Sequence, residues 1–156
     1  MQPLVSQRTY PFAFNPRVRA DQEIDTHSSF EDTPQRTILF VDDEPSILAL
    51  RRFVFEALGY LVLTAASGPE ALDLLHAHAV DAVVLDYLMC PMDGEEIARI
   101  IRQEYGKIPV VLSSGCLSLP QSLLDIVDVS IAKGGPPGRL IEVLKHLFTL
   151  RVSRLR

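Results

Sequence analysis

Residues 82–94 read AVVLDYLMCPMDG: an apolar run ends in one carboxylate, Asp86, and continues into a loop with Pro91 and Asp93-Gly94. Four consecutive apolar residues predict a short strand that is buried on both faces, as in a parallel sheet covered by helices. Asp-Gly after the loop is typical of a turn and a helix cap. A charge at the end of a buried strand needs partners, so Asp86 is a candidate site residue.

The same pattern repeats along the chain, because short apolar runs alternate with segments of helical periodicity. The runs predict strands at residues 38–41, 61–65, 82–85, 108–112 and 129–132. Helices are expected at residues 45–58, 68–75, 94–104, 119–127 and 140–148. Gly59 would end the first helix, and a capping box from Ser67 to Glu70 would open the second. This alternation predicts an α/β fold, a doubly wound five-stranded parallel sheet with helices on both faces.

Polar residues follow four of the five predicted strands. They are Asp42-Asp43, Asp86, Ser113-Ser114-Gly115 and Lys133. The carboxyl ends of parallel strands lie at one edge of the sheet, where ligands bind in folds of this kind. We therefore expect three carboxylates, a hydroxyl and an ammonium group to converge at this edge.

This set of groups suits phosphoryl chemistry. Clustered carboxylates repel one another, and a divalent cation relieves the repulsion. Hard oxygen ligands with few fixed protein donors favour Mg²⁺. A carboxylate beside Mg²⁺ and a lysine is a plausible phosphoryl acceptor, because phosphoryl transfer depends on positioning and charge neutralisation.

Composition limits the other classes of function. The chain has 156 residues, a length typical of one domain, and a net charge of −5, which argues against broad nucleic-acid or membrane binding. Cys90 and Cys116 do not have metal-site spacing, and two inert thiols are favoured over a redox pair. A cytoplasmic location is expected, because no long apolar run or secretory signal is present.

Three regions are expected along the chain. Residues 1–35 have scattered aromatic residues, prolines and charges without a period, which is typical of a disordered arm. Residues 36–150 would form the α/β domain, and residues 151–156 a short basic tail.

The ordered set of motifs resembles the receiver domain of bacterial two-component response regulators. The matching pieces are ILFVDDEPSILALRR, VVLDYLMCPMDG, IPVVLSSG and IAKGG, and the resemblance covers residues 37–150. It implies a flavodoxin-like sheet of order 2-1-3-4-5.

The resemblance also implies roles for individual residues. Asp86 would be the phosphoacceptor. Asp43, Asp86 and the backbone carbonyl of Leu88 would bind Mg²⁺ directly, and Asp42 would act in the same pocket through water. The remaining roles concern the phosphoryl group: Lys133 would pair with its oxygens, Ser114 would report its presence, and Gly115 would leave room beside it.

The sequence departs from the family pattern at several positions. Cys90 stands where a proline is usual, and apolar Leu88 stands where a polar residue is common, so it could shield the phosphoryl group. Ser130 replaces an aromatic residue, which puts the usual output mechanism in doubt. The helix near Pro120 is expected to be short or displaced. Gly134 follows the lysine, so a cis bond there is not expected.

We therefore expect a stand-alone receiver, phosphorylated by a histidine kinase or phosphotransfer protein, that signals through protein contacts to an unknown target. A weak homodimer is left open. One alternative is a degenerate receiver that binds without phosphorylation. Another is an Mg²⁺-dependent phosphohydrolase, although Leu88 stands where such enzymes need a second carboxylate. A dinucleotide enzyme is disfavoured, because no glycine-rich loop follows the first strand.

Overall fold

The structure is a computed structural model, and it describes residues 35–116 and 118–153. The predicted arm, apart from Gln35, and the last three residues of the predicted tail lie outside the described residues. No helix in the described ranges is long and apolar enough to cross a membrane.

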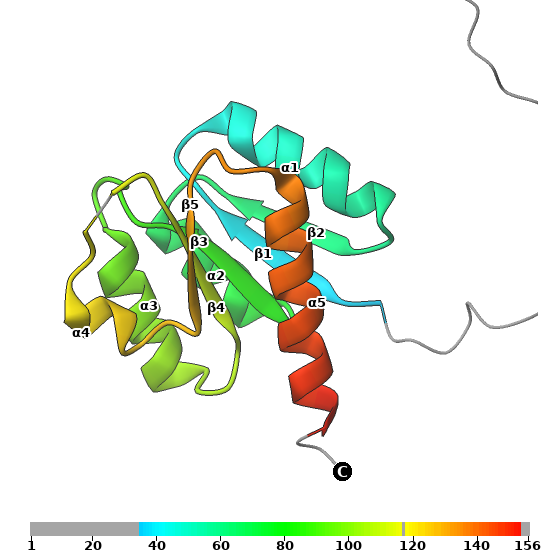
Figure 1. The fold of residues 1–156 in the computed structure, drawn as a ribbon. Coiled ribbons are helices and arrows are strands. Elements are labelled where there is room, and N and C mark those ends of the chain that lie inside the picture. Colours follow the sequence, from blue (N-terminus) through cyan, green and yellow to red (C-terminus); the bar gives the residue numbers. More distant parts are fainter. Residues whose placement is uncertain (1–34, 117, 154–156) are drawn as a thin grey trace, which may run out of the picture. The chain divides into compact units, whose positions relative to one another are not determined.

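Five parallel strands alternate with five helices in the described part of the chain (Figure 1). The sheet order is β2-β1-β3-β4-β5, which confirms the predicted doubly wound, flavodoxin-like fold. The elements are β1 (Thr37–Val41), α1 (Pro45–Ala57), β2 (Leu61–Ala65), α2 (Gly68–Ala77), β3 (Ala82–Asp86), α3 (Gly94–Glu104), β4 (Val110–Ser114), α4 (Gln121–Leu124), β5 (Val129–Ala132) and α5 (Pro137–Ser153).

The sheet separates two apolar layers. Helices α1 and α5 pack on one face, while α2, α3 and α4 pack on the other (Figure 1). Alternate residues of a strand enter alternate layers: Phe40 belongs to the α1–α5 layer, and Val41 to the opposite layer. Every residue of β3 and β4 is buried, as a central strand of such a sheet requires.

Local signals account for several element ends. Gly59 adopts a φ of 87° just after α1, which is the left-handed conformation that glycine tolerates at a helix end. Ser67 caps α2 by accepting a hydrogen bond from the Glu70 amide at 3.4 Å. Asp93 caps α3 by accepting from the Glu96 amide at 2.9 Å, so the predicted turn and cap at Asp93-Gly94 is confirmed.

The predicted limits of three elements are wrong. Helix α5, expected at 140–148, runs from Pro137 to Ser153 and so includes the first three residues of the predicted tail. Strand β4 runs to Ser114 instead of ending at the last apolar residue, because Ser113 and Ser114 still pair with Asp86 and Ala132 on the neighbouring strands. The helix expected at 119–127 is only the four-residue α4, which begins after Pro120. The expectation that the helix near Pro120 is short or displaced is confirmed, because it has four residues.

Strand β5 differs from the prediction that each strand is buried on both faces. Its residues alternate between half-buried and exposed, and Ser130 and Ala132 are the exposed ones. Strand β5 lies at the sheet edge, and the short α4 leaves its outer face open.

The Phe40–Phe55 contact is a test of the α1–α5 layer. Phe55 is 1% exposed, and its ring centroid lies 5.0 Å from that of Phe40. We expect Phe55→Ala to lower the free energy of unfolding by about 3–5 kcal/mol, because it leaves a cavity in the layer. Phe53, on the same helix, is 74% exposed, so Phe53→Ala should change it by less than about 0.5 kcal/mol. Urea denaturation measures both; equal losses would contradict this packing.

Candidate functional site

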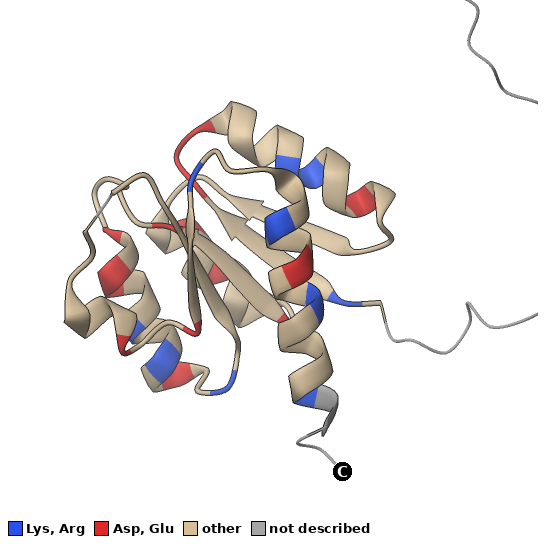
Figure 2. Cartoon of the chain, in the orientation of Figure 1, with Lys and Arg blue, Asp and Glu red and all other residues tan. Residues whose placement is uncertain are grey.

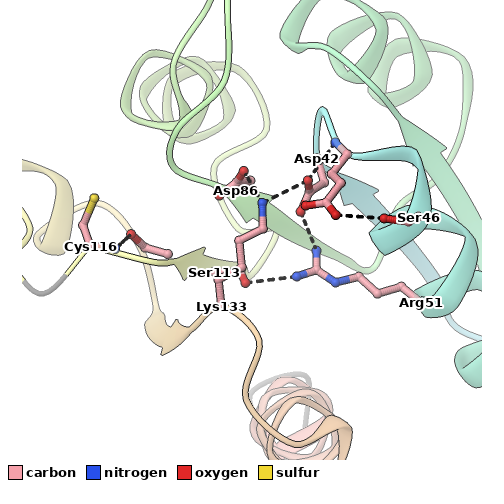
Figure 3. Close-up of polar contacts among 9 residues, drawn as sticks. Asp42, Ser46, Arg51, Asp86, Ser113, Cys116 and Lys133 are labelled. Atoms are coloured by element: carbon pink, nitrogen blue, oxygen red, sulfur yellow. Dashed lines mark hydrogen bonds and ion pairs between the residues drawn. The ribbon is translucent and has the colours of Figure 1, made fainter.

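The predicted carboxylates and the lysine meet at one edge of the sheet, where Asp42, Asp86 and Lys133 point toward one another (Figure 3). The predicted hydroxyl of Ser114 does not join them, because it lies on the other side of the sheet. Asp42 follows β1, Asp86 ends β3, and Lys133 follows β5. Strand alternation directs the side chains of Asp42, Asp86 and Ser113 toward the α1–α5 side of the sheet. The site is therefore assembled by strands that lie far apart in the sequence.

Asp42 is the most enclosed member of the site, with no exposed surface. Its Oδ1 accepts hydrogen bonds from the Glu44 amide at 3.0 Å and from Lys133 Nζ at 3.1 Å. Its Oδ2 is buried and has no hydrogen-bond partner. Asp42 thus keeps one carboxylate oxygen free for a further ligand.

Lys133 joins the two buried carboxylates. Its Nζ lies 2.7 Å from Asp86 Oδ2 and 3.1 Å from Asp42 Oδ1. Burial lowers the pKa of Lys133, but the hydrogen bonds and charges of Asp86 and Asp42 outweigh it, so that the pKa is raised overall. Lys133 therefore remains an ammonium group at any physiological pH.

Asp43 completes an acidic cluster from the exposed side. One carboxylate oxygen from each of Asp42, Asp43 and Asp86 can be chosen so that all lie within 4.8 Å of one another. Carboxylate oxygens at this spacing, together with the free oxygen of Asp42, fit a hard divalent cation such as Mg²⁺. Asp43 is the exposed member of the cluster, whereas Asp42 and Asp86 are buried.

Arg51 is a member of the site that the sequence analysis missed. Its side chain is 12% exposed and reaches from α1 to Ser113 on β4, where Nη2 donates to Oγ at 3.0 Å (Figure 3). Its Nη1 lies 3.7 Å from Asp42 Oδ2, and the guanidinium carbon lies 5.6 Å from the centroid of the Phe40 ring.

Burial lowers the pKa of Arg51, while the charges of Asp42 and Asp86 act in the opposite direction. A signal for its position was present in the sequence. Arg51 is three residues after Leu48 and four before Phe55, both buried, so it lies on the core-facing side of α1.

Ser114 lies at the same edge but on the other side of the sheet. Its Oγ accepts a hydrogen bond from the Cys116 amide at 3.0 Å. Among the described residues, no hydrogen bond joins its hydroxyl to Asp86 or Lys133. An added Cβ at Gly115 would meet nothing within 4 Å, so there is open space beside this residue.

The loop after β3 is held against the site by α3. A Cβ at Gly94 would lie 2.8 Å from Tyr87 Cα and would overlap the carbonyl oxygen of Asp86, so glycine allows α3 to begin directly behind Asp86. The Leu88 side chain is 60% exposed on this loop.

Within the described ranges, the cis peptide bond is Cys90–Pro91, so the bond after Lys133 is trans, as expected. Cys90 and Cys116 are both free thiols.

The chain matches a protein-family model over residues 38–130, which is more than half of its length. The model describes the response regulator receiver domain. With the sheet order and the acidic edge of the sheet, this match defines a signalling domain. The chain belongs to the response regulator receiver family.

Relatives agree with this assignment. The chain is 38% identical over 77 residues to the alkaline phosphatase synthesis transcriptional regulatory protein PhoP of Bacillus subtilis, a match that covers 49% of this chain and 32% of PhoP. The chain therefore corresponds to about a third of that relative's length.

Solved structures also agree. The response regulator TrrA of Thermotoga maritima, solved with Mg²⁺-BeF, is 30% identical, and the match has a TM-score of 0.68 over 72% of this chain and 99% of TrrA. A second structure, of TrrA in complex with the histidine kinase ThkA, matches with a TM-score of 0.67 at 30% identity over 72% of this chain and 98% of that chain.

The ion pairs of Lys133 give a testable pH dependence. Its folded-state pKa lies above the ordinary value of 10.5, so its stabilisation is complete below about pH 10.5 and is lost as the pH rises through the raised pKa. We expect Lys133→Met, without Mg²⁺, to lower the free energy of unfolding by about 1–3 kcal/mol at pH 7, because it leaves two buried carboxylates without their ammonium partner.

The difference from wild type should shrink above pH 10.5. Urea denaturation across pH measures it, with Lys145→Met on the exposed face of α5 as the control. A difference that stays constant up to pH 12 would contradict the raised pKa.

Proposed function

We propose that this chain is a phosphoacceptor receiver that takes a phosphoryl group on Asp86 from a histidine kinase or a phosphotransfer protein and signals through protein contacts. The observation that carries the proposal is the placement of Asp86. It is 3% exposed, its Oδ2 is held 2.7 Å from Lys133 Nζ, and it shares the acidic cluster with Asp42 and Asp43.

The reaction follows from this placement. A carboxylate oxygen of Asp86 attacks the phosphorus of a phosphohistidine, the new O–P bond forms, and the P–N bond breaks. The electron pair of that bond goes to the imidazole nitrogen. In the proposal, Lys133 forms an ion pair with the phosphoryl oxygens, because its ammonium group already contacts Asp86.

In the proposal, Asp43, Asp86 and the backbone carbonyl of Leu88 would bind Mg²⁺ directly. Asp42 would act in the same pocket through water. When bound, Mg²⁺ neutralises charge on the phosphoryl oxygens. In the proposal, Ser114 reports phosphorylation. Its hydroxyl leaves the Cys116 amide and turns toward the phosphoryl group, and Gly115 leaves room for this movement.

The comparisons support the choice of ligand and partner. The related TrrA was solved with Mg²⁺-BeF in one structure and with the histidine kinase ThkA in another. We propose that this chain likewise binds Mg²⁺ and a histidine kinase. The reactions it takes part in would be its own phosphorylation and dephosphorylation, as in a signalling protein.

The proposed output is a protein target in the cytoplasm. The net charge is −5, and basic and acidic residues are interspersed on α1, α3 and α5 (Figure 2). This distribution does not favour nucleic acid as the ligand, because binding to phosphates needs a concentrated positive surface. We propose that residues 36–150 form the receiver and that it acts as a stand-alone domain.

A degenerate receiver is the second candidate, and two observations favour it. Ser130 is exposed where an aromatic residue would complete the usual switch, and α4 has only four residues. A phosphohydrolase is disfavoured, because the side chain two residues after Asp86 is the exposed, apolar Leu88.

The first experiment is incubation with Mg²⁺ and acetyl phosphate followed by intact mass measurement. We expect wild type to gain the mass of one phosphoryl group and Asp86→Asn to gain none, because the amide is a poor nucleophile. Asp93→Asn is the matched control, since Asp93 only caps α3, and it should be modified like wild type. No adduct on wild type, with acetyl phosphate and with a panel of kinases, would favour the degenerate receiver.

Leu88 gives a second test of the site. Its apolar side chain is 60% exposed two residues after Asp86, and in the proposal it keeps water from the phosphoryl group. We expect Leu88→Asn to speed loss of the phosphoryl group by about threefold to tenfold, a change of roughly 1 kcal/mol in the barrier. Leu150→Asn, at an exposed leucine of α5, is the control. An unchanged rate in Leu88→Asn, followed by mass measurement over time, would end this idea.

A further inference from the structure

We propose that Arg51 is an internal counter-cation of the acidic cluster and that it sets the Mg²⁺ concentration at which the site is filled. This role rests on the proposed metal site and makes Arg51 a positioning residue. It holds the cluster in its metal-free form and is displaced from Asp42 when the metal binds.

The first argument is the balance of charge. Asp42, Asp43 and Asp86 bring three negative charges, and Lys133 alone would leave two of them uncompensated. Arg51 reduces the excess to one. A cluster with a smaller negative excess attracts a divalent cation less strongly, since each unit of charge acts directly on the metal.

The second argument is burial. Arg51 is 12% exposed and Asp42 has no exposed side-chain surface, so solvent screens this pair weakly. The guanidinium group is therefore a strong source of repulsion toward a metal at the cluster. It also costs free energy to keep such a cation buried, and the ion pair with Asp42 and the contact with the Phe40 ring offset part of this cost.

The third argument is the geometry of the contact. Arg51 Nη1 and Asp42 Oδ2 are 3.7 Å apart, and neither atom has a hydrogen-bond partner. Lys133, in contrast, contacts the same carboxylate at 3.1 Å through a hydrogen bond. Arg51 therefore compensates the charge of Asp42 without occupying its second oxygen, so a metal or its bound water can take that oxygen.

The fourth argument is that Arg51 has space to withdraw. Together with Ser113, it lines a cavity of about 220 Å³ between α1 and the start of α5, whose apolar walls include Ile47 and Leu140. Its hydrogen bond to Ser113 can guide it toward this cavity when the contact with Asp42 is lost.

The simpler explanation is that Arg51 only stabilises the fold. Three variants separate the two roles. Arg51→Met removes charge and hydrogen bond, Arg51→Gln removes the charge but keeps an amide that can bond to Ser113, and Arg51→Lys keeps the charge. Arg52→Met is the matched control: Arg52 is the exposed neighbour on α1 and bonds to Thr64 on β2, so it loses the same charge away from the site.

The test is the Kd for Mg²⁺ from calorimetric titration with magnesium chloride. We expect Arg51→Met and Arg51→Gln to bind Mg²⁺ about tenfold more tightly than wild type, because a buried positive charge is gone. Arg51→Lys and Arg52→Met should stay within about twofold of wild type. The rise in Tm on adding Mg²⁺, measured for each variant against its own metal-free form, should follow the same order.

An unchanged or weaker Mg²⁺ affinity in both neutral variants, with wild type binding Mg²⁺ and gaining a phosphoryl group, would overturn the role of Arg51 and leave the proposed function intact. If neither wild type nor the neutral variants bind Mg²⁺, the proposed metal site fails as well. Tighter binding in Arg51→Met but not in Arg51→Gln would assign the effect to repacking rather than charge, and would also overturn the proposal.

Discussion

Repulsion among three carboxylates at one edge of the sheet is the constraint on which the site depends. The sheet places Asp42 and Asp86 next to each other because β1 and β3 are paired in parallel and end at the same level. Two buried anions at this spacing are unfavourable without a cation. Lys133 supplies this cation, and its ammonium group donates a hydrogen bond to each of the two carboxylates. This contact ties β5 to the middle of the sheet and makes the end of β5 part of the site.

Much of this arrangement could be predicted from the sequence, because it follows from chain order. Apolar runs of four or five residues marked the strands, and parallel pairing brings their carboxyl ends together whatever the packing between them. The acidic cluster and its lysine needed no knowledge of side-chain contacts. The same reasoning correctly placed the caps at Ser67 and Asp93, since capping depends on residues within one turn.

The features that the sequence did not reveal depend on contacts between distant segments. Strand β4 continues through Ser113 because its neighbours still pair with it, although the residue is polar. Arg51 was not among the residues predicted for the site, because its contact with Ser113 depends on the approach of α1 to β4. Arg102 of α3 donates to the Ile126 carbonyl and pairs with Asp128, and these contacts with the segment after α4 are not contained in any local pattern.

The two faces of the sheet carry different polar residues at its carboxyl edge. The charged contacts of Asp86 lie on the α1–α5 side, whereas Ser114 and Ser130 lie on the side of α4, where β5 is exposed. The end of β4 contributes to both sides, because Ser113 accepts a hydrogen bond from Arg51 on one side and Ser114 accepts one from the Cys116 amide on the other. Two successive residues of one strand thus place one hydroxyl beside the acidic site and the other on the side where β5 is exposed.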